Sequence, residues 1–336
     1  MVAELVFSVR DLAQMRFAVS PMWEVGPSFR LLGCGSVHPV HRPWTEQVRP
    51  RLAAAGLDRG WLAELIPPSG YVPDFLNPTP SGPAPGLPAE LDGIMAARAE
   101  RVRHDLDRLR HERGGRLGPR SQALYERPRA RLATVTEEIQ RYWEIALAPY
   151  WARIRAVLDA DVSHRARQVA EGGTARLLND LHASVRWDVD TLQLPRRPKA
   201  LSRHTAGQGL LLIPSVFTGP GPFTRVAPPE PLHIAYPARG IGSLWEQRST
   251  AGTAALAAVL GRARTLLLTE LGNPASTTEL ARRTGLSPAG VSQNLTALRD
   301  AGLVSAHRTG RSVLYARTSV AESVLDAACP GDGGAP

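Results

Sequence analysis

Lysine is almost absent from this chain of 336 residues, because Lys199 is the only lysine among its 40 basic side chains. Arginine therefore supplies nearly all of the positive charge, and the formal net charge is +9. A basic chain favours polyanionic partners, although it can also simply have a well-solvated surface. The positions of the arginines are therefore more informative than their number.

Cysteine and long apolar runs are also scarce. Only Cys34 and Cys329 are present, and two such distant cysteines do not form a disulfide framework, so a reducing compartment is the simplest setting. No run approaches the roughly 18–20 apolar residues of a membrane helix. Charges at Glu4, Arg10 and Asp11 interrupt any signal-peptide core. We expect a cytoplasmic protein that does not insert into a membrane.

The length predicts two or three domains. Residues 67–88 contain eight prolines, which excludes regular helix and predicts a loop. Around this loop, apolar spacing predicts mostly helix, and two short apolar runs predict strands. The predicted helices cover residues 21–32, 89–113, 129–148, 149–171 and 174–184. The predicted strands cover residues 209–217 and 231–236.

The fold class expected from these patterns is mainly α with small β. Residues 1–245 are predicted to form a mostly helical sensing or dimerisation domain with a small antiparallel sheet. Residues 250–327 are predicted to form a winged helix-turn-helix domain, and residues 328–336 a flexible tail. The second domain begins with an alanine- and leucine-rich segment, residues 249–273, which reads as one helix.

Two capped helices follow that segment. Ser276 stands three residues before Glu279, which fits a reciprocal capping box, and Gly285 is suited to end the helix with a positive φ. Ser287 is a good N-cap for a helix over residues 287–299, and Pro288 is favourable at its first position.

The helix over residues 287–299 has two different faces. Val291, Leu295 and Leu298 form one inward stripe. Small and polar residues occupy the other face, where Ser and Gln can both donate to and accept from base edges. Its candidate DNA-binding residues are Ser287, Pro288, Ala289, Gly290, Ser292, Gln293 and Thr296.

Residues 304–316 then predict a two-stranded hairpin, with Val304 and Ala306 alternating on one strand and Val313 and Tyr315 on the other. Residues 255–320 contain eight arginines and three carboxylates, a net charge of +5 that is typical of a duplex binder. Helix, turn, helix and hairpin in this order predict a winged helix-turn-helix whose second helix enters the major groove. The candidate phosphate contacts are Arg282, Arg283, Arg308 and Arg311.

The segment TELARRTGLSPAGVSQNLTALRDAGLVSAHRTGRSVLYA, residues 278–316, resembles the ArsR/SmtB-type winged-helix transcriptional regulators, and the resemblance extends over residues 256–318. The family's serine in the recognition helix falls on Ser292, its structural leucines on Leu295 and Leu298, and its AGLV turn on residues 301–304. The resemblance implies a homodimer on a roughly palindromic double-stranded DNA operator, usually a repressor that an effector releases.

Three further stretches, RFAVSPMWEV, LLLIPSVF and YPARGIGSLWE, look like those of long ArsR-type regulators of high-GC bacteria. Metal-sensing members of the family place cysteines where this chain has TTELARR, so the sequence does not support thiolate metal sensing. We therefore expect any effector to be a small organic molecule.

No other motif predicts a site. The pairs His38 and His41, and His104 and His111, lack the companions and spacing of a zinc site. Gly33-Cys34-Gly35 is not a nucleotide fingerprint, because no strand–GxGxxG–helix unit surrounds it. The sequence predicts no metal, no cofactor and no catalytic residue.

Two alternative functions remain open. The winged helix could serve as a protein-interaction or dimerisation module, or it could dimerise an enzyme. An enzyme would need a cofactor-binding glycine loop, which the sequence lacks, so we predict that the chain is not an enzyme.

Overall fold

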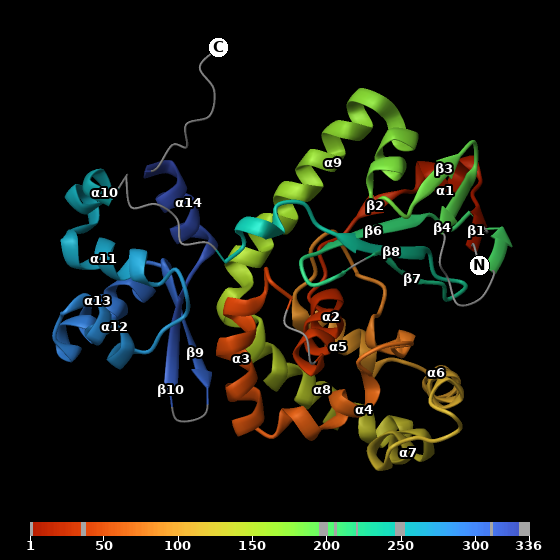
Figure 1. Ribbon diagram of the computed structural model, residues 1–336, viewed down its shortest axis with the longest axis horizontal. Coiled ribbons are helices and arrows are strands. Elements are labelled where there is room, and N and C mark those ends of the chain that lie inside the picture. The colour runs from red at the N-terminus through yellow and green to blue at the C-terminus, as the bar shows by residue number, and fades with distance from the viewer. Residues whose placement is uncertain are drawn as a thin grey trace. The chain divides into compact units, whose positions relative to one another are not determined.

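The structure is a computed structural model that describes residues 3–34, 38–194, 201–204, 207–219, 221–245, 253–309 and 312–328 (Figure 1). It divides into two compact units, each assembled from three stretches of the chain. Unit 1 holds residues 1–37, 57–139 and 157–241, and unit 2 holds residues 38–56, 140–156 and 242–336. Sequence patterns did not indicate that residues 38–56 and 140–156 would join the C-terminal stretch.

The chain is mainly α-helical with small sheets, as predicted, and its C-terminal part has the order of a winged helix-turn-helix. The helices of unit 1 are α1 Val9–Ala13, α2 Met22–Gly33, α4 Trp61–Leu65, α5 Leu87–Met95, α6 Ala99–Glu112 and α7 Pro119–Glu126. Two long helices, α8 Pro128–Ala146 and α9 Trp151–Asp180, contribute residues to both units.

Two helix predictions need correction or refinement. The single helix expected over residues 89–113 is two helices, α5 and α6, because Arg98 is extended with φ −65° and ψ 141°. Ile94 of α5 and Val102 and Leu106 of α6 are all fully buried, whereas Met95 is 43% exposed. Gly173, at φ +74°, interrupts α9 between its two helical stretches, as the sequence predicted, but the second stretch ends at Asp180.

Unit 1 contains two four-stranded sheets, with strand orders β3-β4-β1-β5 and β2-β6-β8-β7. The strands are β1 Ala3–Val6, β2 Arg16–Phe17, β3 Arg186–Asp188, β4 Thr191–Leu194, β5 Leu201–His204, β6 Leu210–Ser215, β7 Phe223–Arg225 and β8 Leu232–Pro237. β6 and β8 are the two strands predicted from the apolar runs.

The pairing of these strands is mixed, where the sequence predicted an antiparallel sheet. β6 and β8 run parallel, while β7 pairs antiparallel with β8 at the sheet edge. β7 lies in the connection between β6 and β8, so the hairpin that it forms with β8 turns β8 into the direction of β6. The sequence did not predict β7, because the connection between β6 and β8 is rich in glycine and proline, which are typical of loops.

Side chains of the second sheet alternate between two apolar clusters, as the twofold period of a strand requires. Leu210 and Leu212 belong to a cluster that includes Leu177 and Leu178 of α9. Leu211 and Ile213 belong to the other cluster, with Ala18, Trp23 and Ala235. The sheet is therefore buried on both faces, which explains why its two strands read as continuous apolar runs.

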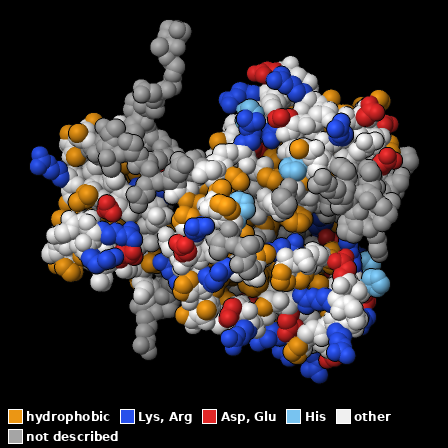
Figure 2. Space-filling model, in the orientation of Figure 1, with side chains coloured by type: hydrophobic (Ala, Val, Ile, Leu, Met, Phe, Trp, Pro, Cys, Tyr) orange, Lys and Arg blue, Asp and Glu red, His pale blue; other side chains and the backbone are white. Residues whose placement is uncertain are grey.

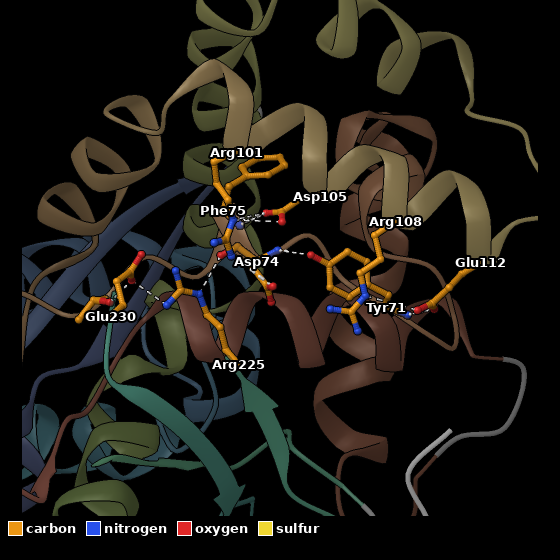
Figure 3. A network of polar contacts seen from close by, with 10 residues as sticks. Tyr71, Asp74, Phe75, Arg101, Asp105, Arg108, Glu112, Arg225 and Glu230 are labelled. Atoms are coloured by element: carbon orange, nitrogen blue, oxygen red, sulfur yellow. Dashed lines mark hydrogen bonds and ion pairs between the residues drawn. The ribbon is translucent and has the colours of Figure 1, made fainter. Parts of the chain in front are cut away.

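Carboxylates hold the proline-rich segment 67–88 in place (Figure 3). Glu112 accepts a hydrogen bond from the Tyr71 amide at 2.8 Å, and Asp105 accepts one from the Phe75 amide at 2.8 Å. Arg101 pairs with Asp105 at 3.1 Å and with Asp74 at 3.2 Å. These contacts fix a segment that has almost no backbone hydrogen bonds of its own.

Other loops of unit 1 are held in the same way. Glu24 of α2 accepts hydrogen bonds from the amides of Val216 and Phe217 after β6, at 2.9 and 3.3 Å. Glu90 of α5 accepts one from the Met22 amide at 2.9 Å. Burial raises the pKa of Glu24 to about 8 and that of Glu90 to about 7, against these hydrogen bonds, which lower it.

Unit 2 contains the winged helix and the two shorter stretches of chain. Its further elements are α3 Arg42–Ala54, the 3-10 helix η3 Ala148–Tyr150, α10 Thr253–Leu260, α11 Arg262–Glu270, α12 Thr277–Thr284, α13 Pro288–Asp300, β9 Val304–Thr309, β10 Ser312–Arg317 and α14 Ser319–Ala328. The helix predicted over residues 249–273 is divided into α10 and α11 at Gly261, whose φ is +88°. Residues 249–252 lie outside the described residues.

Candidate nucleic-acid interface

A compact apolar core fixes the orientation of α13. Val291, Leu295 and Leu298 are at most 1% exposed and pack with residues of α11, α12 and β9. The predicted inward stripe is confirmed. Because one face of α13 is fully buried, the opposite face must point away from the core.

The turn between α12 and α13 has the cap chemistry that its sequence predicts, with one exception. The Ser276 hydroxyl accepts a hydrogen bond from the Glu279 amide at 3.2 Å, and Gly285 ends α12 at φ +71°. The Glu279 side chain pairs with Arg283, one helical turn further on, and does not return to the Ser276 amide. The reciprocal half of the predicted capping box is therefore absent, because the i,i+4 ion pair competes for the same carboxylate.

The start of α13 is also capped. The Ser287 hydroxyl accepts a hydrogen bond from the Gly290 amide at 3.1 Å, and Pro288 occupies the first helical position. Gly290 is half-buried, while Ser287, Pro288 and Ala289 are exposed. The cap therefore presents a narrow helix end with small side chains.

Ser292, Gln293 and Thr296 are exposed on the outer face of α13. No hydrogen bond joins these three side chains to any other described residue, whereas the neighbouring Asn294 donates to the Gly290 carbonyl at 2.8 Å. Their donors and acceptors are directed to solvent. The structure thus brings the predicted base-reading residues together on one uncovered surface.

The arginines of the winged helix differ in their availability. Arg282 and Arg308 are exposed, and Arg283 is exposed but paired with Glu279. Arg311 lies outside the described residues. Arg317 is only 8% exposed and donates to the Leu268 and Thr269 carbonyls at 2.6 and 2.7 Å, so it caps the end of α11. It cannot serve as a phosphate contact.

The hairpin β9–β10 pairs Arg308 with Val313 and Tyr315 with Ala306. Of the four alternating residues singled out by the sequence, Val304 is buried and Tyr315 is half-buried against the winged-helix core. The prediction was wrong for Ala306 and Val313, which are exposed, while Leu314 and Ala316 are buried instead. Tyr315 exchanges two backbone hydrogen bonds with Ala275, which precedes α12. The segment before α12 thus adds an isolated antiparallel bridge beside β10.

Two residues of the motifs that the sequence analysis rejected as sites can be placed in the structure. Cys34 is half-buried, and the His41 ring accepts a hydrogen bond from the Trp245 indole at 3.1 Å. Among the described residues, no three His, Cys, Asp or Glu side chains are grouped to hold a metal ion. No described helix is long and apolar enough to cross a membrane.

Residues 263–305 match the family of helix-turn-helix domains. No curated protein and no solved structure matches the chain. The matched residues cover α12, the turn and α13, which are the elements that carry the exposed polar face. The helix-turn-helix domain suggests that this chain is a DNA-binding regulator.

Proposed function

We propose that the chain is an ArsR-type transcriptional repressor that binds a palindromic DNA operator as a homodimer. In this proposal α13 enters the major groove, and the β9–β10 hairpin lies beside it on the phosphates. The observation that carries the proposal is the exposed face of Ser292, Gln293 and Thr296 on a helix whose other face is fully buried.

The chemistry of this face suits base recognition. The Gln293 amide has a donor and an acceptor side by side, which matches the N6 and N7 edge of adenine. The hydroxyls of Ser292 and Thr296 can donate or accept, so they fit several bases. Ala289 and Gly290 leave room for the helix start to approach the groove floor.

The dimer interface is proposed to include α10 and α14, which contact each other in unit 2. Val259 of α10 is 81% exposed and Val320 of α14 is 54% exposed. A second copy of the chain could cover these apolar side chains and place two α13 helices on successive major grooves. Sedimentation of the full chain, compared with its Val259→Asp and Val320→Asp variants, tests this interface.

We further propose that unit 1 senses a small organic effector. It has apolar clusters of its own around both faces of a sheet, and a compound that changes their packing would alter operator binding. A screen of organic compounds against the full chain should find one that raises Tm and lowers operator affinity. If no compound did both, the effector would have to be abandoned.

The Gln293→Ala substitution tests the proposed base contact. It should weaken binding to the operator by roughly 1–3 kcal/mol and relax the preference at one base pair. The operator would first be selected from a random duplex pool and located beside the chain's own gene, where a reporter shows the sign of regulation. Gln14→Ala, which removes an exposed glutamine of unit 1, is the matched control.

Unchanged affinity and base preference in Gln293→Ala would contradict the role of α13. Recovery of no sequence motif from the pool would favour a protein-interaction module. Arg308→Gln should instead weaken binding to all duplexes and reduce the salt slope by roughly 1. An unchanged slope would remove Arg308 from the contact surface.

A further inference from the structure

The excess of positive charge is confined to two segments of the chain. Residues 98–131 contain eleven arginines and five carboxylates, a net charge of +6, and residues 255–320 carry +5. Together they exceed the net charge of the whole chain, +9, so all other residues sum to −2. A general preference for arginine over lysine does not explain the first segment, because elsewhere acidic residues balance the arginines.

Residues 98–131 form α6, α7 and the first turn of α8 in unit 1. The Arg103 guanidinium donates to the Tyr125 carbonyl at 3.1 Å, and the Arg110 guanidinium lies 5.3 Å from the centre of the Tyr125 ring. The Tyr125 hydroxyl donates to Asp107 at 3.5 Å. These contacts tie α6 to the C-terminal end of α7.

The arginines of this region differ in their partners. Arg101, Arg108, Arg110 and Arg120 have carboxylate partners. Five others are exposed and have no ion pair with any described residue: Arg98, Arg116, Arg127, Arg129 and Arg131. We call the last four of these, which follow α6 in the chain, the α7 arginine surface. Figure 2 shows basic side chains together with acidic ones over the α6 and α7 region.

Folding alone does not favour this arrangement. Arg127, Arg129 and Arg131 lie at the N-terminal end of α8, whose first turn has no acidic residue. Positive charge is unfavourable at a helix N-terminus, and like charges four residues apart repel each other. A bound anion would offset both effects, so the placement indicates a polyanionic partner.

The other side chains of the segment distinguish between polyanions. No large apolar side chain is exposed between residues 98 and 131, so a lipid surface would find nothing to insert. Tyr125 is the only Phe, Trp or Tyr of the segment, and Arg110 lies over its ring, so unpaired bases would find no stacking platform. Arginine without apolar or aromatic neighbours suits the phosphates of a duplex.

We propose that the α7 arginine surface is a second, sequence-independent DNA-binding surface that binds duplex phosphates. The proposal rests on the proposed function for the identity of the partner. It adds to α13 a contact that contributes affinity without base preference, because phosphates carry no sequence information directly. It also assigns a role to a part of unit 1 that the helix-turn-helix match does not reach.

The test replaces Arg127, Arg129 and Arg131 together by Gln in the full chain. Binding to a 40-base-pair duplex of random sequence is measured across a range of salt concentrations. The slope of log K against log salt should fall by roughly two to three, since each lost phosphate contact removes about 0.9. The corresponding triple Lys variant keeps the charge and should keep the slope.

A matched control replaces Arg59, Arg167 and Arg176 by Gln. These three exposed arginines of unit 1 lie outside both basic segments and give the same change in net charge. The control should leave the slope unchanged. Equal losses in both Gln variants would overturn the proposal, because net charge alone would then explain the effect.

Further outcomes separate this proposal from the proposed function. If Gln293→Ala weakens operator binding while the Arg127/Arg129/Arg131 variant has the wild-type salt slope, α13 reads DNA and the second surface is wrong. If the triple variant loses binding only to vesicles with anionic lipid or to single-stranded RNA, duplex binding by this surface is also wrong. If the wild-type chain binds no duplex, both proposals fail.

Discussion

The winged helix and unit 1 are stabilised by different means. Between residues 262 and 304, apolar side chains recur at helical spacing, and serines cap the two central helices. In unit 1, segments without regular structure are fixed by carboxylates that reach them from distant helices. Glu24 binds amides 192 and 193 residues away, and Asp105 binds one 30 residues away.

This difference determines how much of each region can be predicted. Helix caps and apolar helical stripes are local patterns, because the residues that interact lie within a few positions of each other in the sequence. A carboxylate that binds a distant amide leaves no local pattern, because its partner is a backbone group that every residue has. The structure of unit 1 is therefore much harder to predict from the sequence than that of the winged helix, although unit 1 contains most of the buried side chains.

The largest expected effect comes from the core of α13. Leu295→Ala removes a fully buried side chain and should destabilise the winged helix by about 3 kcal/mol. Hydrogen exchange should rise in peptides from residues 262–317 and stay unchanged in residues 99–139. A matched rise in both regions would show that the two regions unfold together and are not stabilised separately.

A slightly smaller effect is expected from the network that holds the proline-rich segment. Asp105→Ala leaves the Phe75 amide without its acceptor and Arg101 without one partner. Since an unsatisfied buried donor is costly, we expect a loss of about 2–3 kcal/mol. Exchange should rise in residues 67–88 and 99–112 but not in α13. If residues 67–88 stayed protected from hydrogen exchange, their apolar contacts alone would be enough to hold the segment in place.

A third prediction concerns pH. His233 is fully buried on β8, its Nε2 lies 3.2 Å from the Thr79 hydroxyl, and its Nδ1 has no partner among the described residues. Burial, followed by the nearby Arg225, lowers its pKa from 6.5 to about 3. A proton on Nδ1 would add a buried charge with no acceptor.

Because the unfolded chain takes up this proton below pH 6.5 and the folded chain does not until about pH 3, the His233 contribution to stability falls as pH drops through this window. The loss should be about 1 kcal/mol per pH unit. Urea unfolding of the wild type and of His233→Gln at pH 7 and pH 5, followed by tryptophan fluorescence, measures it. This signal reports on both units, because Trp23, Trp61 and Trp187 belong to unit 1 and the other four tryptophans to unit 2. Equal pH dependence in both proteins would contradict the assignment.

Particular residues show which features could be predicted from the sequence and which could not. The inward stripe of α13 and the caps at Ser276 and Ser287 follow from spacing alone. The same logic was wrong for Ala306 of β9 and Val313 of β10, which are exposed. It also counted Arg317 among the DNA-binding charges, whereas that side chain binds carbonyls of α11. The α7 arginine surface was missed, although the local net charge of residues 98–131 would have revealed it.

The order of the winged helix-turn-helix elements and the small, polar composition of the outer face of α13 can be predicted from the sequence alone. Both follow from short-range periodicity and capping, which depend on neighbours along the chain. The mixed pairing of β6, β7 and β8 and the division of the arginines into paired and unpaired ones emerge only in the folded chain. These depend on contacts between segments far apart in the sequence, where burial and available partners set the outcome.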